Sequence, residues 1–343
     1  MRTSAVAHLG GMWAWDPLEI TSDLASLDGG GRWGVVLPYS GQPTLVRFAQ
    51  WSVNPPEPSI GPWSGVGEQA WSSSLDEEQY VAGVRRIQEY IAAGEVYQAN
   101  LCRVLEAPVA PDDDILALHR ALAMGNPAPY GSAISVPEVA LHVACASPEL
   151  FLRREGDVLR SGPIKGTAPS PGLLLEKDLA ENVMIVDLVR NDLSRVAKTG
   201  TVRVPDLLRI EEHPGLVHLV SDVECRLVQD EKWASILEAS FPPGSVTGAP
   251  KSSALRIIDE CEAAPRDVYC GAIGWIDADR QAAELAVAIR TFWIRGGTLR
   301  FGTGAGITWG SDPYGEWQET LLKARTLCGI ASQSIPAMSA ASR

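Results

Sequence analysis

Three consecutive stretches near the C-terminal end constrain the fold most strongly, because each is rich in β-branched and other apolar residues. They are residues 268–276, 283–294 and 298–307. Only short turns separate them, and a short turn joins neighbouring strands that run antiparallel. Other strands are separated by helices. We therefore expect an α+β fold, in which antiparallel β-sheets pack as a sandwich, helices lie outside and the active site occupies a central cleft.

Helical periodicity and end signals predict the remaining elements. Ser74 and Glu77 predict a capping box at the start of a helix that Gly94 ends. The apolar stripe of this helix is Val81, Val84, Ile87 and Ile91. Further helices are expected at residues 113–123, 175–197 and 250–261 and after Asp312, and further strands at 33–37, 44–48, 96–105, 131–136 and 139–144.

Tryptophan distribution divides the chain. Residues 1–70 contain Trp13, Trp15, Trp33, Trp51 and Trp63, and they include a proline-rich connector at 54–62. These side chains suit core packing, with a ligand pocket as the alternative. We expect residues 1–70 to form a short β-rich subregion, 71–332 the main domain and 333–343 a disordered tail.

Composition excludes several classes of protein. A net charge of −13 and a pI of about 4.9 argue against nucleic-acid binding, which requires a basic face. No apolar run is long enough for a transmembrane helix, and the N-terminus lacks the apolar core of a signal peptide. The six cysteines include no Cys-x-x-Cys pair, which argues against a disulfide or zinc framework and fits a reducing cytoplasm.

Lys165 lies in Ser-Gly-Pro-Ile-Lys-Gly-Thr-Ala-Pro, residues 161–169. Glycine permits positive φ and proline restricts φ, so we expect a shaped loop here rather than a helix or a central strand. A single lysine in such a loop is either an anion ligand or a nucleophile, or else a solvated turn residue.

Two expected helices carry pairs of acids at i, i+3 spacing, which places both carboxylates on one face. The pairs are Asp178 with Glu181 and Glu316 with Glu319. A solvated acidic face is the simpler interpretation of either pair. If all four converge, however, they require a cation, and Mg²⁺ suits carboxylate ligands.

Other motifs leave alternatives open. Gly302–Gly306 could present backbone N–H groups to a carboxylate or to a nucleotide phosphate, or could form a tight turn. Residues 244–252 resemble a phosphate loop, but Pro250 precedes the lysine, so the Walker spacing is wrong. Arg290 and His218 lie among apolar residues; Arg290 suits a carboxylate partner or a structural salt bridge, and His218 suits a satisfied core position.

Taken together, these segments resemble the chorismate-utilising enzyme family, from about Asp76 to Ile330. The similarity lies in ordered stretches at residues 95–101, 146–151, 161–169, 181–193, 245–251, 266–274 and 304–319. Residues 71–332 would then be a chorismate-binding catalytic domain. Lysine at position 165 resembles component I of the aminodeoxychorismate synthases, in the para-aminobenzoate branch of folate biosynthesis, whereas anthranilate synthases generally have alanine there. Isochorismate and salicylate synthases usually have lysine where this chain has Gln98.

The resemblance implies a role for each site residue. Lys165 would attack chorismate as a nucleophile, and Glu149 would protonate the leaving hydroxyl. Mg²⁺ would be held by Glu181 and Glu319, with Glu316 and Asp178 completing the shell. Substrate would contact Arg290, Tyr269, His218, Thr247, Gly248, Gly304, Ala305 and Gly306.

Ammonia must come from a partner under this interpretation. None of the six cysteines lies in a Gly-x-Cys-x-Gly elbow, so we expect a separate glutamine amidotransferase subunit. Two alternatives remain: component I of an anthranilate synthase, and a catalytically silent chorismate-binding subunit.

Overall fold

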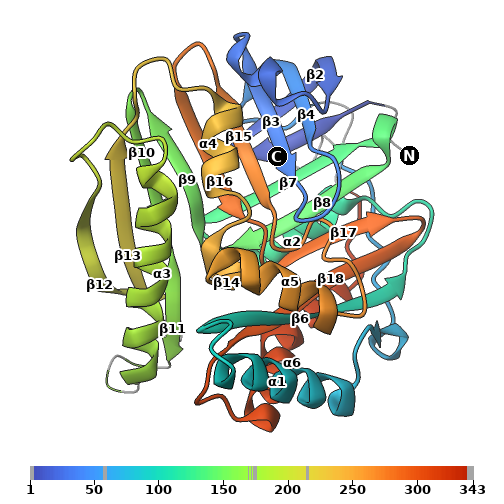
Figure 1. Ribbon diagram of the computed structural model, residues 1–343. Coiled ribbons are helices and arrows are strands. Elements are labelled where there is room, and N and C mark those ends of the chain that lie inside the picture. The colour runs from blue at the N-terminus through green and yellow to red at the C-terminus, as the bar shows by residue number, and fades with distance from the viewer. Residues whose placement is uncertain are drawn as a thin grey trace.

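A computed structural model describes residues 4–56, 60–168, 170, 172, 176–213 and 216–337. Across these ranges helices pack against one curled, 18-stranded sheet (Figure 1), and the pairings between its named strands are antiparallel. The α+β prediction is therefore confirmed. No helix within these ranges is long and apolar enough to cross a membrane.

Strand pairing follows one path through the sheet. The first half runs through β6 (Gln98–Pro108), β18 (Thr298–Ile307), β17 (Thr291–Arg295), β8 (Leu141–Ser147), β7 (Tyr130–Val136), β1 (Val6–Leu9), β2 (Met12–Thr21) and β4 (Thr44–Ser52). Short strands β5 (Ser72–Ser73) and β14 (Gly248–Ala249) also pair with β6.

The second half continues from β4. It runs through β3 (Arg32–Leu37), β15 (Ala272–Asp277), β16 (Ala282–Val287), β9 (Leu150–Glu155), β10 (Val158–Gly162) and β13 (Leu216–Arg226), which pairs with β12 (Arg203–His213) and β11 (Ile164–Ala168). The N-terminal strands thus join the same sheet as the rest of the chain. One buried core contains residues from both halves.

Helices cover both ends of this path. Helices α1 (Glu77–Ala92) and α6 (Pro313–Ala331) pack on each other and on β18, and α5 (Lys251–Cys261) packs on β6 (Figure 1). At the other end α3 (Glu176–Ser194) lies along β11 and β13, beside α4 (Trp233–Ser240). Helix α2 (Ile115–Gly125) packs on β7 and β8.

Several sequence predictions at the element level need correction. The capping box of α1 uses Asp76 and Gln79, not Ser74 and Glu77. The long strand expected at 283–294 is two strands, because Arg290 has a left-handed φ of 52° between them.

The segment around Lys165 is strand β11 rather than a loop. Gly166, with φ of 76°, absorbs the irregularity as a bulge, and within the described residues β11 pairs with β13 alone. An edge strand tolerates the neighbouring proline that a central strand would not.

Two of the N-terminal tryptophans, Trp33 and Trp63, serve packing. Trp33 and Trp63 are fully buried, and the Trp63 indole donates to the carbonyl of Ala331 over 2.8 Å. Trp63 also forms a β-bridge with Ile335, close to the C-terminal end of the described chain. Residues 338–343 of the expected tail lie outside the described residues.

Candidate active site

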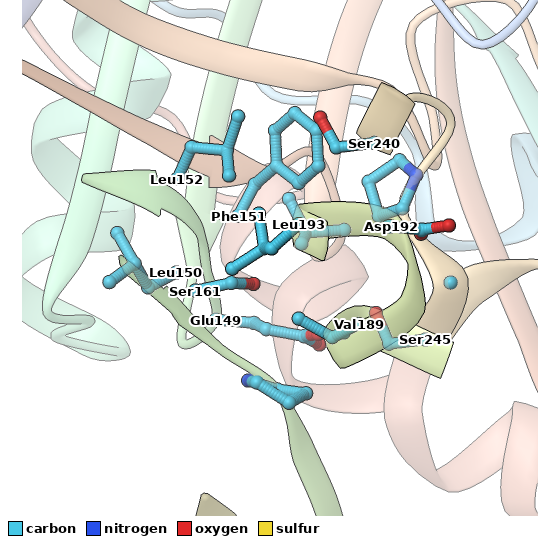
Figure 2. A pocket seen from close by; sticks show the side chains of 14 residues that line it. Glu149, Leu150, Phe151, Leu152, Ser161, Val189, Asp192, Leu193, Ser240 and Ser245 are labelled. Atoms are coloured by element: carbon cyan, nitrogen blue, oxygen red, sulfur yellow. The ribbon is translucent and has the colours of Figure 1, made fainter. Parts of the chain in front are cut away.

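Lys165 and Glu149 come together on one residue, Ser245. The Lys165 amine donates to the Ser245 carbonyl over 3.0 Å, and the Ser245 side chain hydrogen-bonds the Glu149 carboxyl. Figure 2 shows Glu149 pointing toward Ser245 and Val189. The three residues come from β11, from the turn before β9 and from the 3₁₀ turn η5 (Gly244–Val246). The predicted nucleophile and the predicted acid therefore share one site.

Burial controls the chemistry of Glu149. Its side chain is buried beside Leu150 and Phe151, and this desolvation raises the pKa of its carboxyl to about 7. Hydrogen bonds from Ser245 and from the backbone of Ile164, and the charge of Lys165, act in the opposite direction. A carboxyl with such a pKa is protonated in a large fraction of molecules near neutral pH. This is the state that a general acid needs.

A small cavity of about 20 Å³ lies against these groups (Figure 2), with room for one water-sized molecule. Its polar lining includes Glu149, Ser161, Asp192, Ser240 and Ser245. A larger cavity of about 1080 Å³ lies elsewhere, between the N-terminal strands and the start of α2. None of the predicted site residues lines that larger cavity.

The segment at residues 244–252 is not a phosphate loop. The Lys251 amine pairs with Asp192 of α3 over 2.7 Å, and both side chains are largely buried. Thr247 is buried, and its hydroxyl donates to the carbonyls of Pro243 and Gly244. Gly248 pairs with Ala99 of β6 and has a φ of 147°, and a Cβ atom there would lie 2.1 Å from the Gln98 carbonyl oxygen. These contacts make the segment a structural clamp that presents Ser245 to the site.

Arg290 is half-buried between β16 and β17. Burial lowers the pKa of its guanidinium, and within the described residues no carboxylate forms a salt bridge with it. The salt-bridge alternative is therefore wrong for this structure. A guanidinium held at the edge of the core without an acid is suited to bind a carboxylate ligand.

The other predicted substrate contacts occupy three separate elements. His218 is buried on β13, opposite Thr167 of β11. Gly304, Ala305 and Gly306 lie on β18, opposite residues 100–102 of β6. Tyr269 is buried with its ring against Gly302, where a Cβ atom would lie 2.1 Å from the ring. Burial raises the pKa of the Tyr269 hydroxyl, so it remains a neutral donor.

The four predicted metal ligands are of the right chemical type but are distributed over two helices. Asp178 and Glu181 lie in the first turns of α3, and Glu316 and Glu319 lie in the first turns of α6. In the described part of the chain, no three His, Cys, Asp or Glu side chains gather closely enough to hold a metal ion. Glu319 forms an ion pair with Lys323 over 2.6 Å. Magnesium therefore stays a prediction, and binding by all four acids requires movement.

Sequence reasoning missed two residues at this site. In the sequence Ser245 is only one member of the motif at residues 244–252. Its role depends on contacts with Lys165 and Glu149, which are distant from it in the chain. Lys323 bonds both Glu319 and the carbonyl of Gly304, over 2.9 Å. Its i+4 position relative to Glu319 was a usable signal.

Comparison with known proteins identifies the family of this chain. Residues 46–329 match the family described as chorismate binding enzyme, and the chain belongs to that family. It is 41% identical over 275 residues to anthranilate synthase component 1 of Streptomyces coelicolor, covering 76% of this chain and 53% of that protein. It is 39% identical over 271 residues to aminodeoxychorismate synthase component 1 of Klebsiella aerogenes, covering 75% and 59%. The chain thus spans about half the length of the curated relatives it matches.

Solved structures show the same fold. Anthranilate synthase component I from Streptococcus pneumoniae superposes with a TM-score of 0.77 at 22% identity, covering 96% of this chain and 93% of that one. A menaquinone-specific isochorismate synthase from Escherichia coli gives 0.76 at 20% identity, covering 96% and 88%.

Proposed function

We propose that this protein aminates chorismate at C4 with ammonia, giving 4-amino-4-deoxychorismate for the para-aminobenzoate and folate branch. The observation that carries the proposal is the meeting of Lys165 and Glu149 on Ser245, with the pKa of Glu149 raised to about 7. A nucleophile and a proton donor in one buried site are what displacement of a hydroxyl group requires.

The reaction has two steps. In the first, the neutral Lys165 amine attacks C2, the two conjugated ring double bonds both shift, and the C4 hydroxyl leaves as water with the proton of Glu149. In the second, ammonia attacks C4, both double bonds shift back and the bond from C2 to the Lys165 amine breaks, which releases the amine. Lys165 has to lose its proton before attack.

Substrate binding would use the groups around this pair. Arg290, which forms no salt bridge with a carboxylate among the described residues, would hold a carboxylate of chorismate, together with Tyr269 and the N–H groups of residues 304–306. Thr247, Gly248 and His218 would line the ring. Mg²⁺, bound by Glu181 and Glu319 with Glu316 and Asp178, would neutralise the ring carboxylate.

The ammonia would come from a separate glutamine amidotransferase subunit, and the complex would work in the cytoplasm. The designation component 1 of several relatives supports a multi-component enzyme. The absence of a Gly-x-Cys-x-Gly elbow from this sequence supports the same view.

A second candidate is the activity of anthranilate synthase component 1, because the relative at 41% identity carries that name. Such an enzyme eliminates pyruvate and forms an aromatic ring. Lysine at position 165 favours the first candidate.

Mass spectrometry of the products separates the candidates. Purified protein is incubated with chorismate, Mg²⁺ and ammonium, or with glutamine in place of ammonium. We expect 4-amino-4-deoxychorismate from ammonium and no product from glutamine. Anthranilate with pyruvate would establish the second candidate, and binding of chorismate without turnover would indicate a silent subunit.

A further inference from the structure

Ser245 contacts the nucleophile and the acid with different atoms. Its carbonyl accepts from the Lys165 amine over 3.0 Å, and also from the Asn100 side chain over 3.4 Å. Its side-chain hydroxyl bonds the Glu149 carboxyl. Only 5% of the Ser245 surface is exposed, so water competes little for either contact. Ser245 therefore links Lys165 and Glu149, which lie on separate segments of the chain.

The turn that carries Ser245 is clamped from several directions. Arg266 donates to the Val246 carbonyl over 2.6 Å, and it is held in turn by Glu262. The backbone N–H of Asn100 donates to the Thr247 carbonyl over 2.8 Å. Gly244 lies against Leu188 of α3, where a Cβ atom would come within 2.6 Å. Such clamping keeps the Ser245 hydroxyl and carbonyl in fixed directions.

We propose that Ser245 is a positioning residue, whose hydroxyl fixes the Glu149 carboxyl while its carbonyl fixes the Lys165 amine. This inference deepens the amination proposed above and rests on it for its catalytic meaning. Holding two reacting groups in a fixed relative orientation removes an entropic part of the barrier. A rotated Glu149 would be a poorer proton donor to a hydroxyl that leaves opposite Lys165.

The surroundings of Glu149 determine which effect a Ser245 variant has. Lys165 of β11 is the cation that acts on Glu149, and Asp192 of α3, paired with Lys251 of α5, lines the same cavity. The Ser245 hydrogen bond favours the ionised carboxylate. Removing the hydroxyl therefore raises the pKa of Glu149 further, and the alkaline decline of the rate moves to higher pH.

The test compares Ser245→Ala with two controls. Ser245→Thr keeps the hydroxyl, and Ser132→Ala makes the same chemical change at a buried serine of β7 outside the cavity, whose hydroxyl bonds the Tyr130 carbonyl instead. The readouts are the pH profile of kcat with ammonium and the titration of Glu149 in substrate-free protein, followed by carboxyl ¹³C NMR.

We expect Ser245→Ala to lower kcat about 10- to 100-fold and to shift both the alkaline limb and the Glu149 titration upward. Ser245→Thr should restore most of kcat, and Ser132→Ala should match wild type. An unchanged Glu149 titration in folded Ser245→Ala would overturn the inference, as would equal effects from Ser132→Ala. Since the titration needs no chorismate, a wild-type protein that fails to aminate chorismate would refute the proposed function and leave this test standing.

Discussion

At the residue scale, opposing influences act on the pKa of the Glu149 carboxyl. Burial raises its pKa, whereas the Ser245 and Ile164 hydrogen bonds and the Lys165 charge limit the rise. The sequence alone identified both Glu149 and Lys165 through their family resemblance. It could not identify the contact between them, because that contact passes through Ser245, a residue 80 positions from Lys165.

Replacing Glu149 by glutamine should separate activity from stability. The folded pKa of about 7 exceeds the reference value of 4.5, so its contribution to stability is complete below about pH 4.5 and is lost as pH rises through 7. Glutamine cannot ionise, so we expect the variant to be more stable than wild type at pH 8, by at most about 3 kcal/mol, and similar at pH 4. Urea denaturation at the two pH values measures this.

The same variant should lose activity. Without the acidic proton, kcat should fall by about 10²- to 10⁴-fold, and the alkaline limb near pH 7 should disappear. A variant that keeps wild-type kcat, or that loses stability at pH 8, would contradict this role for Glu149.

At the element scale, sequence patterns located strands and helices better than their irregularities. The apolar pattern predicted β18 at 298–307, and the capping signals predicted that α6 begins after Asp312; both agree with the structure. The bulge at Gly166 and the break at Arg290 were missed, because both depend on the neighbouring strand, which single-sequence patterns do not contain. Both irregularities occur at predicted site residues or directly beside them, where function constrains the backbone.

The ion pair between Lys251 and Asp192 joins α5 to α3. Lys251→Met would leave Asp192 buried without its cation, so we expect a loss of roughly 3–5 kcal/mol in unfolding free energy. The double variant Lys251→Met with Asp192→Asn should recover much of this loss. Arg86→Met, which breaks an exposed pair with Glu89, is the matched control and should cost under about 1 kcal/mol. Chemical denaturation measures the unfolding free energy of each variant. Equal losses of unfolding free energy from Lys251→Met and Arg86→Met would contradict a stabilising role for the ion pair between Lys251 and Asp192.

At the scale of the whole molecule, the sheet path begins at β6 and ends at β11 and β12, and the η5 turn connects these ends. Lys165 of β11 and Asn100 of β6 both bond the Ser245 carbonyl. These contacts join residues that are far apart in the sequence, and they arise from tertiary packing. Only the resemblance to a family could therefore predict that these residues meet. The acids of α3 and α6 flank the two ends of the path.

Ligand binding should bring these two helices together. Because the four acids have to converge on one ion, chorismate with Mg²⁺ should slow amide hydrogen exchange at residues 178–186 and 313–323. The effect should require both ligands and should be lost in Glu181→Gln. Unchanged exchange in both segments at saturating ligand would contradict a shared metal site.

The central claim is that the Lys165 amine forms a covalent bond with the substrate ring. Protein is incubated with chorismate and Mg²⁺ without any ammonia source, quenched in acid and digested, and the peptide that contains residue 165 is weighed by mass spectrometry. We expect an added mass equal to chorismate minus water on Lys165, and we expect it to disappear when ammonium is supplied. A peptide of unchanged mass, together with rapid amination by Lys165→Ala, would contradict it.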